Sequence, residues 1–299
     1  MILVISSSFD KTIDYIKHKH NVDNFYRFNI DNFSSYAVFY DHNGFSITDL
    51  EGRTLLEKNC SSIYYRKPTP ELLPQKLDSI YHNHLYREVF SLTDGISEAF
   101  RGKCLTKPSL LRKADNKIFQ LREAYEVGFN IPSPLITNNI EIIKSYFSKP
   151  IIKPLSSGTV EYDSKREYVQ TNLVDFNKDT SLLKYGPCYF QEFQNKEYEV
   201  RITIIDNYVY PVKIISENKI DWRKNNNKIQ YELIDIPNKI RKQCFNLMRK
   251  LDISFGCFDF IVMQDKWYFL EVNANGQWVW LEIELGLDIS SKILRHLQC

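Results

Sequence analysis

The sequence predicts an α+β protein in which a small N-terminal α/β domain precedes a larger region that ends in antiparallel strands. Short apolar runs alternate with polar turns and one helical stretch over residues 2–66, a pattern typical of a small α/β unit. Residues 188–273 contain long alternating segments separated by turn residues, which predict antiparallel strands. With 299 residues, 43% of them hydrophobic, the chain can bury the cores of two domains or of one large enzyme-sized unit.

Charge and cysteine usage exclude several classes of protein. Lysine plus arginine number 39 and aspartate plus glutamate 37, so the net charge of +2 gives no global electrostatic case for binding nucleic acid or a membrane surface. The six cysteines form no Cys-x-x-Cys pair and no zinc-ligand spacing, which favours the reducing cytoplasm. The apolar run at residues 2–5 is too short for a signal peptide or a membrane span. We therefore expect a cytoplasmic protein whose function belongs to a local site.

The N-terminal elements follow from short patterns. Strands are predicted at residues 2–5, 36–40 and 62–65, and a helix at residues 12–20. Arg66 and Lys67 come directly after the last of these strands, before a stretch interrupted by prolines. These two cations belong either to a functional site or to a solvated strand end.

The central part begins with the clearest helical pattern in the chain. Apolar residues recur at helical spacing over residues 109–127, and Gly128 follows where a helix C-cap is expected. Within such a helix Lys113 and Lys117, four residues apart, share one face. The elements predicted next, after Pro132 and Pro134, are a short strand, a helix at 140–147 and a buried strand at 150–153.

The C-terminal part is predicted to be largely β. Its expected strands are residues 188–193, 199–206, 208–215, 254–263 and 266–273, and its expected helices are residues 237–251 and segments within 279–297. The stretch 217–228 is polar and rich in asparagine, which is typical of a flexible loop. That loop contains the run Asp-Trp-Arg at 221–223.

Oxygen-bearing side chains interrupt the apolar pattern of the last hairpin. Asp259 lies in one strand, and Glu271 and Asn273 lie two apart on the next, so the latter two share a face. Such a set suits Mg²⁺, which usually combines one or two carboxylates with substrate phosphates. Asp259 joins that face if the turn has three residues, 264–266, and lies on the opposite face if the turn has two. A salt-bridged hairpin without metal is the alternative.

Two cations are candidates for holding anions. Lys153 ends a buried strand and precedes a loop of small residues, 154–159, whose backbone N–H groups are suited to phosphate oxygens. A surface lysine before a turn is the alternative. Arg201 shares a strand face with Glu199, so its guanidinium either holds a phosphate or carboxylate in a fork or pairs with Glu199.

The order of these residues along the chain resembles that of an ATP-grasp ligase. The resemblance covers about residues 105–299 and rests on Lys117, Lys153, Gln191, Glu192, Arg201, Asp259, Glu271 and Asn273. It implies an ATP-grasp fold preceded by an N-terminal α/β, or pre-ATP-grasp, domain, with the chain divided into residues 1–104, 105–190 and 191–299. It also implies that ATP and Mg²⁺ are the cofactors.

The resemblance further assigns roles to individual residues. The magnesium ligands would be Asp259, Glu271 and Asn273. The nucleotide contacts would be Lys117 and Lys153 for the phosphates, Gln191, Glu192 and Phe193 for the adenine, and Glu199 near the ribose. The catalytic cations would be Arg201 and Arg223, the latter on a lid formed by the polar loop, for which a merely flexible loop is the alternative. One departure from the family pattern is that the phosphate loop contains a single glycine, Gly158.

Four further runs resemble the microviridin-type, or graspetide, peptide ligases, including their grasp-with-spasm branch. These runs lie at residues 64–68, 113–117, 221–223 and 273–278 and extend the resemblance over nearly the whole chain. Such enzymes activate an Asp or Glu side chain of a ribosomally made precursor peptide, which has a leader and a core, as an acyl phosphate. A Ser or Thr hydroxyl or a Lys amine then attacks, which closes an ester or amide macrocycle.

Other functions are compatible with the same residues. An ATP-grasp ligase that adds free amino acids to a peptide or protein terminus is the nearest alternative, and a kinase that leaves phosphate on its substrate is another. A nucleotide- or peptide-binding module without turnover is disfavoured, because the chain has the full set of metal ligands. No nucleic acid or membrane partner is expected, and a homodimer is compatible with the sequence.

Overall fold

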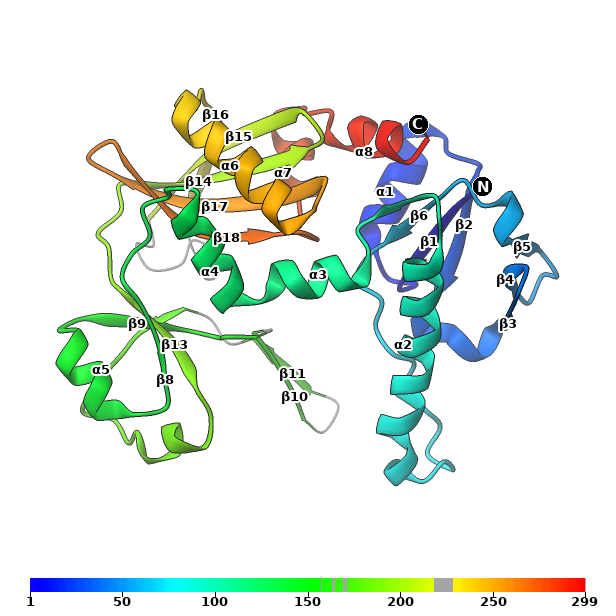
Figure 1. The fold of residues 1–299 in the computed structure, drawn as a ribbon, viewed down its shortest axis with the longest axis horizontal. Helices are drawn as coiled ribbons and strands as arrows, with labels where there is room; N and C mark the ends of the chain where they lie inside the picture. Colours follow the sequence, from blue (N-terminus) through cyan, green and yellow to red (C-terminus); the bar gives the residue numbers. More distant parts are fainter. Residues whose placement is uncertain (157, 163–164, 169–170, 218–227, 299) are drawn as a thin grey trace.

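The computed structural model describes residues 1–156, 158–162, 165–168, 171–217 and 228–298. Its N-terminal part contains a parallel sheet of four strands in the order β2-β1-β6-β7 (Figure 1). These strands are β1 (Ile2–Ser6), β2 (Phe25–Asn29), β6 (Ser62–Tyr65) and β7 (Lys103–Leu105). Helix α1 (Lys11–His20) follows β1. The predicted strands at 2–5 and 62–65 and the predicted helix at 12–20 are confirmed.

A small antiparallel sheet and a long helix complete the N-terminal part. The sheet contains β3 (Ala37–Asp41), β4 (Gly44–Thr48) and β5 (Thr54–Leu56). Helix α2 (His82–Ala99) was not predicted, and its buried residues lie toward its C-terminal end, so its first turns project from the molecule (Figure 1). Short 3-10 segments occur at Ile30–Ser35, Glu57–Asn59, Ser79–Tyr81 and Ser181–Tyr185.

The helix predicted over residues 109–127 is two helices, α3 (Pro108–Asp115) and α4 (Lys117–Glu126). Between them Asn116 has an extended backbone, and its side chain accepts a hydrogen bond from the N–H of Phe119 as the N-cap of α4. The break separates the two lysines that were expected to share a face: Lys113 donates to the carbonyl of Lys250, whereas Lys117 contacts Glu271. The prediction of one continuous helix was wrong because a capping side chain overrode the apolar periodicity.

The central part is a four-stranded antiparallel sheet in the order β12-β9-β13-β8, with one helix against it (Figure 1). Its strands are β8 (Pro134–Thr137), β9 (Pro150–Lys153), β12 (Asn172–Leu173) and β13 (Cys188–Glu192). Helix α5 (Ile140–Tyr146) and the phenylalanine after it form a small core with Phe190 of β13. A separate hairpin, β10 (Thr159–Tyr162) and β11 (Lys165–Tyr168), extends away from this sheet.

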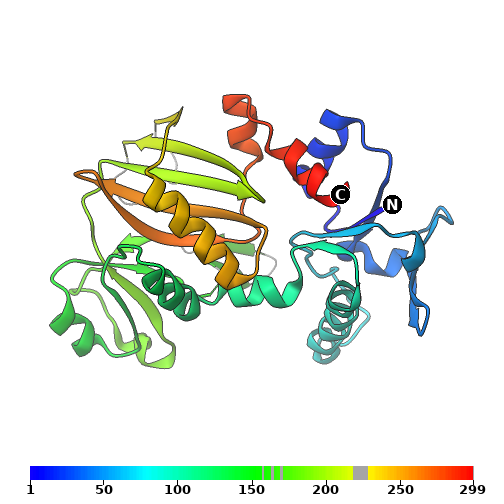
Figure 2. The ribbon, with the colours of Figure 1, turned by 45° about the horizontal axis from the view of Figure 1, so that its top comes forward.

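The C-terminal part is a five-stranded antiparallel sheet in the order β16-β15-β14-β17-β18. The strands are β14 (Tyr198–Ile205), β15 (Tyr208–Ser216), β16 (Ile229–Leu233), β17 (Phe255–Met263) and β18 (Lys266–Asn273). Helix α6 (Asn238–Leu251) lies across one face (Figure 2) and packs with Ile202, Phe258 and Phe260 in the main core. The predicted strands and the predicted helix at 237–251 are confirmed to within two residues.

The last two helices connect the C-terminal sheet to the N-terminal part. Helix α7 (Val279–Leu285) follows β18, and α8 (Ile289–Gln298) contacts β14 on one side and β6 and β7 on the other (Figure 1). Within the residues that the structure describes, no helix combines the length and the apolar character needed to span a membrane.

Candidate active site

One face of the C-terminal sheet carries a row of charged side chains. Arg201 on β14 pairs with Asp259 on β17, and Asp259 pairs with Glu271 on β18. In the next row Cys257 pairs with Asn273. Residues paired across neighbouring strands point to the same side of a sheet, so all of these side chains share the face opposite α6.

The turn of this hairpin is shorter than the one required by the sequence argument. It consists of two residues, Gln264 and Asp265, both with positive φ, which is the conformation that matches the twist of a two-residue hairpin. Of the two turn lengths considered from the sequence, the structure therefore has the two-residue turn. In a regular ladder from a two-residue turn, Asp259 would lie on the face opposite to Glu271.

A β-bulge restores the shared face. Phe260 pairs with Phe269, but the next pair is Asp259 with Glu271, so Leu270 has no residue opposite it. Phe269 consequently points into the core, where it is fully buried, while Glu271 points to the other side although it is only two positions further on. The extra residue lies inside the strand rather than in the turn.

Arg201 is tied to the metal-ligand candidate on the neighbouring strand. Its Nη1 donates to both carboxylate oxygens of Asp259 at 2.8 and 2.9 Å, and its Nη2 donates to the carbonyl of Gln277 at 2.9 Å. Burial alone would lower the pKa of Arg201, but Asp259 outweighs this and raises it above its usual value. The alternative partner is excluded, because Glu199 pairs with Lys196 at 2.5 Å.

Glu271 is held as an anion by the lysine that begins α4. Lys117 donates a hydrogen bond to its carboxylate. Burial favours the neutral acid, but the charge and hydrogen bond of Lys117, with contributions from Lys153 and Asn273, lower the pKa of Glu271 to about 2. Glu271 is therefore ionised at neutral pH and available to a cation.

The three predicted metal ligands are in mutual contact. The Nδ2 of Asn273 lies 3.3 Å from Asp259 Oδ2 and 3.2 Å from Glu271 Oε1. Two carboxylates and one amide form the type of oxygen set that Mg²⁺ binds when substrate phosphates complete its shell. Within the described ranges no three His, Cys, Asp or Glu side chains gather into a metal-binding group, so an all-protein cage is not formed there. The residues present fit Mg²⁺ bound together with phosphate.

The central sheet presents its polar face to this trio. Lys153 ends β9, pairs across the ladder with Tyr189 and donates to Gln191 Oε1 at 2.8 Å. Lys153 helps to lower the pKa of Glu271, and Glu271 in turn adds to the effect of burial that raises the pKa of Tyr189. Lys153 and Tyr189 are thus electrostatically coupled to Glu271, and Gln191 is hydrogen-bonded to both of them.

The predicted adenine segment follows directly from β13. Gln191 is buried and also donates to Tyr189, whereas Glu192 is exposed and Phe193 is half-buried. The N–H groups of Glu192 and Phe193 donate to backbone carbonyls of Ser133 and Lys149. These two N–H groups are therefore already paired within the protein, and Lys149 Nζ lies 4.9 Å from the centroid of the Phe193 ring.

Comparison with known proteins finds one domain model and several solved structures that are similar to this chain. Residues 170–297 match the model of the RimK-like ATP-grasp domain. The macrocyclase MdnC from Microcystis aeruginosa, solved with the precursor peptide MdnA, has a TM-score of 0.88 and 28% identity over 99% of this chain and 99% of its own. The chain has the ATP-grasp fold.

Two further solved structures are similar to this chain over nearly its full length. A RiPP-associated ATP-grasp ligase from Chryseobacterium gregarium, in complex with ADP and a leader and core peptide, gives a TM-score of 0.84 and 27% identity over 98% of this chain and 94% of its own. The macrocyclase MdnB from Microcystis aeruginosa has a TM-score of 0.80 and 25% identity over 99% of this chain and 98% of its own. None of the curated proteins matches the chain.

The sequence left the role of Arg66 open, and the structure places this side chain against the loop that follows β18. Arg66, at the end of β6, is fully buried and donates to Asn275 Oδ1 at 3.0 Å and to Gln277 Oε1 at 2.7 Å. Since the carbonyl of Gln277 accepts from Arg201, one residue joins the two arginines. The signal was the pair of cations after a predicted strand, but nothing local distinguished a buried arginine from a solvated one.

Two predicted site residues, Arg223 and Glu199, are not part of the group of side chains described above. Arg223, with the Asp and Trp that precede it, lies outside the described residues, so its predicted role on a lid has no structural counterpart to report. Glu199 is described and buried, and it forms an ion pair with Lys196 on the same face as Arg201. Lys117, Lys153, Gln191, Arg201 and the metal trio are brought together.

Proposed function

We propose that this chain is an ATP-dependent peptide ligase that activates Asp or Glu side chains of a ribosomally made precursor peptide and closes ester or amide macrocycles. The observation that supports it most directly is the row from Arg201 through Asp259 to Glu271, with Lys117 and Lys153 beside it. Full-length similarity to two macrocyclases and to a ligase with leader and core peptide supports the peptide substrate.

The proposed binding roles follow from charge and position. Asp259, Glu271 and Asn273 would hold Mg²⁺, which when bound would offset the charge of the ATP phosphates. Lys117 and Lys153 would contact phosphate oxygens. The segment of Gln191, Glu192 and Phe193 would contact the adenine, and Glu199 would lie near the ribose. Arg201 and, by resemblance alone, Arg223 would contact the anion that is transferred or activated.

The reaction has two balanced steps. A substrate carboxylate oxygen attacks the γ-phosphorus of ATP, the bond to the β-phosphate oxygen breaks, and ADP leaves. A hydroxyl or amine of the same peptide then attacks the acyl carbon, phosphate leaves with the bonding pair, and the nucleophile loses its proton. The net change in the peptide is the loss of one water per ring. Lys117, Lys153 and Arg201 stabilise the phosphoryl oxygens as their charge is redistributed.

Incubation of the purified protein with MgATP and the short peptide encoded beside its gene tests the proposal. We expect ADP release together with a peptide mass lower by one water per ring. A mass gain by one amino acid residue would instead support a ligase that extends a peptide or protein terminus, and a gain of one phosphoryl group would support a kinase. Unchanged mass across precursors from the gene neighbourhood would contradict the macrocyclase function.

We also propose where the protein acts, how it assembles and how its chain divides into domains. All five cysteines in the described part of the chain are free thiols, which is compatible with action in the cytoplasm. The partner would be the precursor peptide, with its leader and core. A division into residues 1–104, 105–190 and 191–299 and a homodimeric assembly remain proposals, the latter testable by light scattering.

A further inference from the structure

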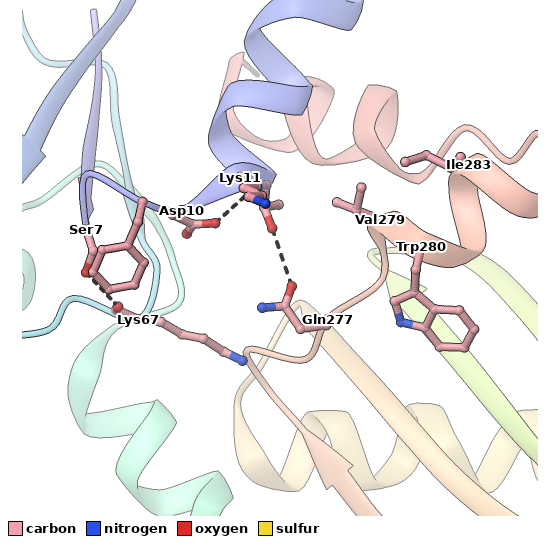
Figure 3. Close-up of a pocket in the computed structure, with 10 residues that line it drawn as sticks. Ser7, Asp10, Lys11, Lys67, Gln277, Val279, Trp280 and Ile283 are labelled. Atoms are coloured by element: carbon pink, nitrogen blue, oxygen red, sulfur yellow. Dashed lines mark hydrogen bonds between the residues drawn. The ribbon is translucent and has the colours of Figure 1, made fainter. Parts of the chain in front are cut away.

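A pocket of about 460 Å³ lies between the N-terminal part and α7, beside the site described above (Figure 3). Its volume falls in the range of roughly 300–1,000 Å³ of ordinary ligand pockets. The residues that line it are Ser7, Phe9, Asp10, Lys11, Thr12, Lys67, Gln277, Val279, Trp280 and Ile283. They come from the start of α1, the end of β6 and the segment after β18.

The polar end of this pocket is continuous with the two buried arginines. Lys67 extends from the N-terminal part toward Gln277 (Figure 3). Gln277 accepts a hydrogen bond from Arg66 through its side chain and another from Arg201 through its carbonyl. Asp10, which also lines the pocket, pairs with Arg66, and Asp259 pairs with Arg201, so Lys67 is the cation that a carboxylate would meet at this end.

The other end of the pocket is apolar. Val279, Trp280 and Ile283 on α7 form one wall (Figure 3), and Phe9 also lines the pocket. Phe9 and Ile283 expose 62% and 63% of their surface, which is high for large apolar side chains at the mouth of a pocket. The wall is firmly placed, because Glu282 on the same helix is buried and bound to Lys19 and Tyr15 of α1.

We propose that this pocket is a substrate subsite that takes an apolar side chain of the precursor core next to the reacting Asp or Glu. The inference rests on the proposed function and specifies its substrate class. A peptide with an acid beside an apolar residue complements a pocket with a cation at one end and an aliphatic and aromatic wall at the other. Consecutive residues of an extended peptide advance by only about 3.3–3.6 Å, so a residue next to the reacting acid stays close to it.

Two exposed residues at the mouth allow a test that leaves the core intact. Phe9→Asp and Ile283→Asp are compared with Phe39→Asp and Ile80→Asp, since Phe39 and Ile80 expose 59% and 72% of their surface and do not line the pocket. For the precursor that the wild-type enzyme cyclises, we expect the two pocket variants to raise KM by about 10-fold or more. The KM for ATP and the melting temperature should match those of the controls.

A substituted precursor identifies the side chain that occupies the pocket. Replacement of the apolar core residue beside the reacting acid by Ser should raise KM for the wild type but add little in Ile283→Asp, because both changes remove the same contact. Equal KM values for pocket and control variants, or fully additive effects, would overturn the subsite while ring formation by the wild type still supports the macrocyclase. Absence of ring formation by the wild type would overturn both.

Discussion

At the residue scale, the loop after β18 places its backbone against Arg201 in a way that only glycine allows. A Cβ at Gly276 would lie 2.6 Å from Cys257 Cβ, 2.7 Å from its Sγ and 3.0 Å from Arg201 Nη2. Real Cβ atoms do not approach other atoms so closely, so either the loop or the guanidinium must move. The next residue, Gln277, would then lose the carbonyl contact that holds Arg201.

We expect Gly276→Ala to lower kcat for ADP release by roughly 10- to 1,000-fold, because Arg201 would no longer be held where phosphoryl charge develops. Gly95→Ala is the matched control, since a Cβ at Gly95 meets no atom within 4 Å and alanine suits its helix. Steady-state kinetics and thermal melting separate the two effects. An unchanged kcat in the folded Gly276→Ala variant would show that the loop does not position Arg201.

Glu271 offers the second test at this scale. We expect Glu271→Gln to abolish Mg²⁺-dependent ADP release, because one of two carboxylates near the metal is lost and Lys117 keeps its charge without a partner. Glu232→Gln on the same sheet, where the glutamate is exposed, should leave turnover unchanged. Titration of ADP release with Mg²⁺ makes the measurement, and turnover equal to that of the control would refute the metal assignment.

These residues differ in how far the sequence could reveal them. Asp259 and Glu271 were predictable because a charge inside an apolar strand needs a partner, and the pairing confirms that they share a face. For Arg66 the sequence allowed two interpretations, a residue of a functional site or a residue at a solvated strand end. Its burial depends on Asn275, which is 209 residues away, and no local pattern contains such a contact.

At the scale of the element, the hairpin shows where a pattern argument fails in detail. Alternation correctly placed Glu271 and Asn273 on one face. For Asp259 to share that face one extra residue is needed, and the sequence argument looked for this residue in the turn. The turn has two residues and Leu270 forms a bulge, which periodicity cannot distinguish from a longer turn because both shift the register by one residue. The break at Asn116 is a similar case, since one capping side chain decides between one helix and two.

The bulge makes a prediction that compares two deletions in the same strand. Deletion of Leu270 should preserve ADP release to within about 10-fold, because the remaining residues alternate regularly with Phe269 inward and Glu271 outward. Deletion of Val272 should abolish it, because Asn273 would move to the core face. ADP release and melting temperature are measured for both. A Leu270 deletion as inactive as the Val272 deletion would mean that the bulge has a role beyond register.

At the scale of the whole molecule, the N-terminal part and the C-terminal sheet are joined by contacts between residues more than 200 positions apart. Arg66 bonds to Asn275 and Gln277, and α1 bonds to α7 through Glu282. The sequence predicted most strands and helices on the C-terminal side of this junction, and on the N-terminal side it predicted β1, β3, β6 and α1. It could not predict the junction or the pocket inside it, because both depend on how separate elements pack rather than on local periodicity.

Glu282 is the clearest test of this junction. Its carboxylate accepts from Lys19 Nζ at 2.6 Å, Tyr15 OH at 3.0 Å and the N–H of Ser290 at 2.6 Å. Burial opposes the charge of Lys19, but bonds to Glu282 and Tyr15 outweigh it and raise the pKa of Lys19 above 10.5. The contribution to stability is therefore complete below that pH and is lost as pH rises through the folded-state pKa.

We expect Glu282→Gln to reduce the free energy of unfolding by about 1–3 kcal/mol, since buried donors lose a charged acceptor. It should also raise KM for the precursor more than KM for ATP, because α1 and α7 form the two sides of the pocket while the metal-ligand row lies on another element. A cycle with Lys19→Met isolates the ion pair, for which we expect a coupling of about 0.5–3 kcal/mol. A coupling of zero between Glu282 and Lys19 would contradict the ion pair. Equal changes in the KM for the precursor and the KM for ATP would show that the junction stabilises the fold as a whole and does not shape the pocket.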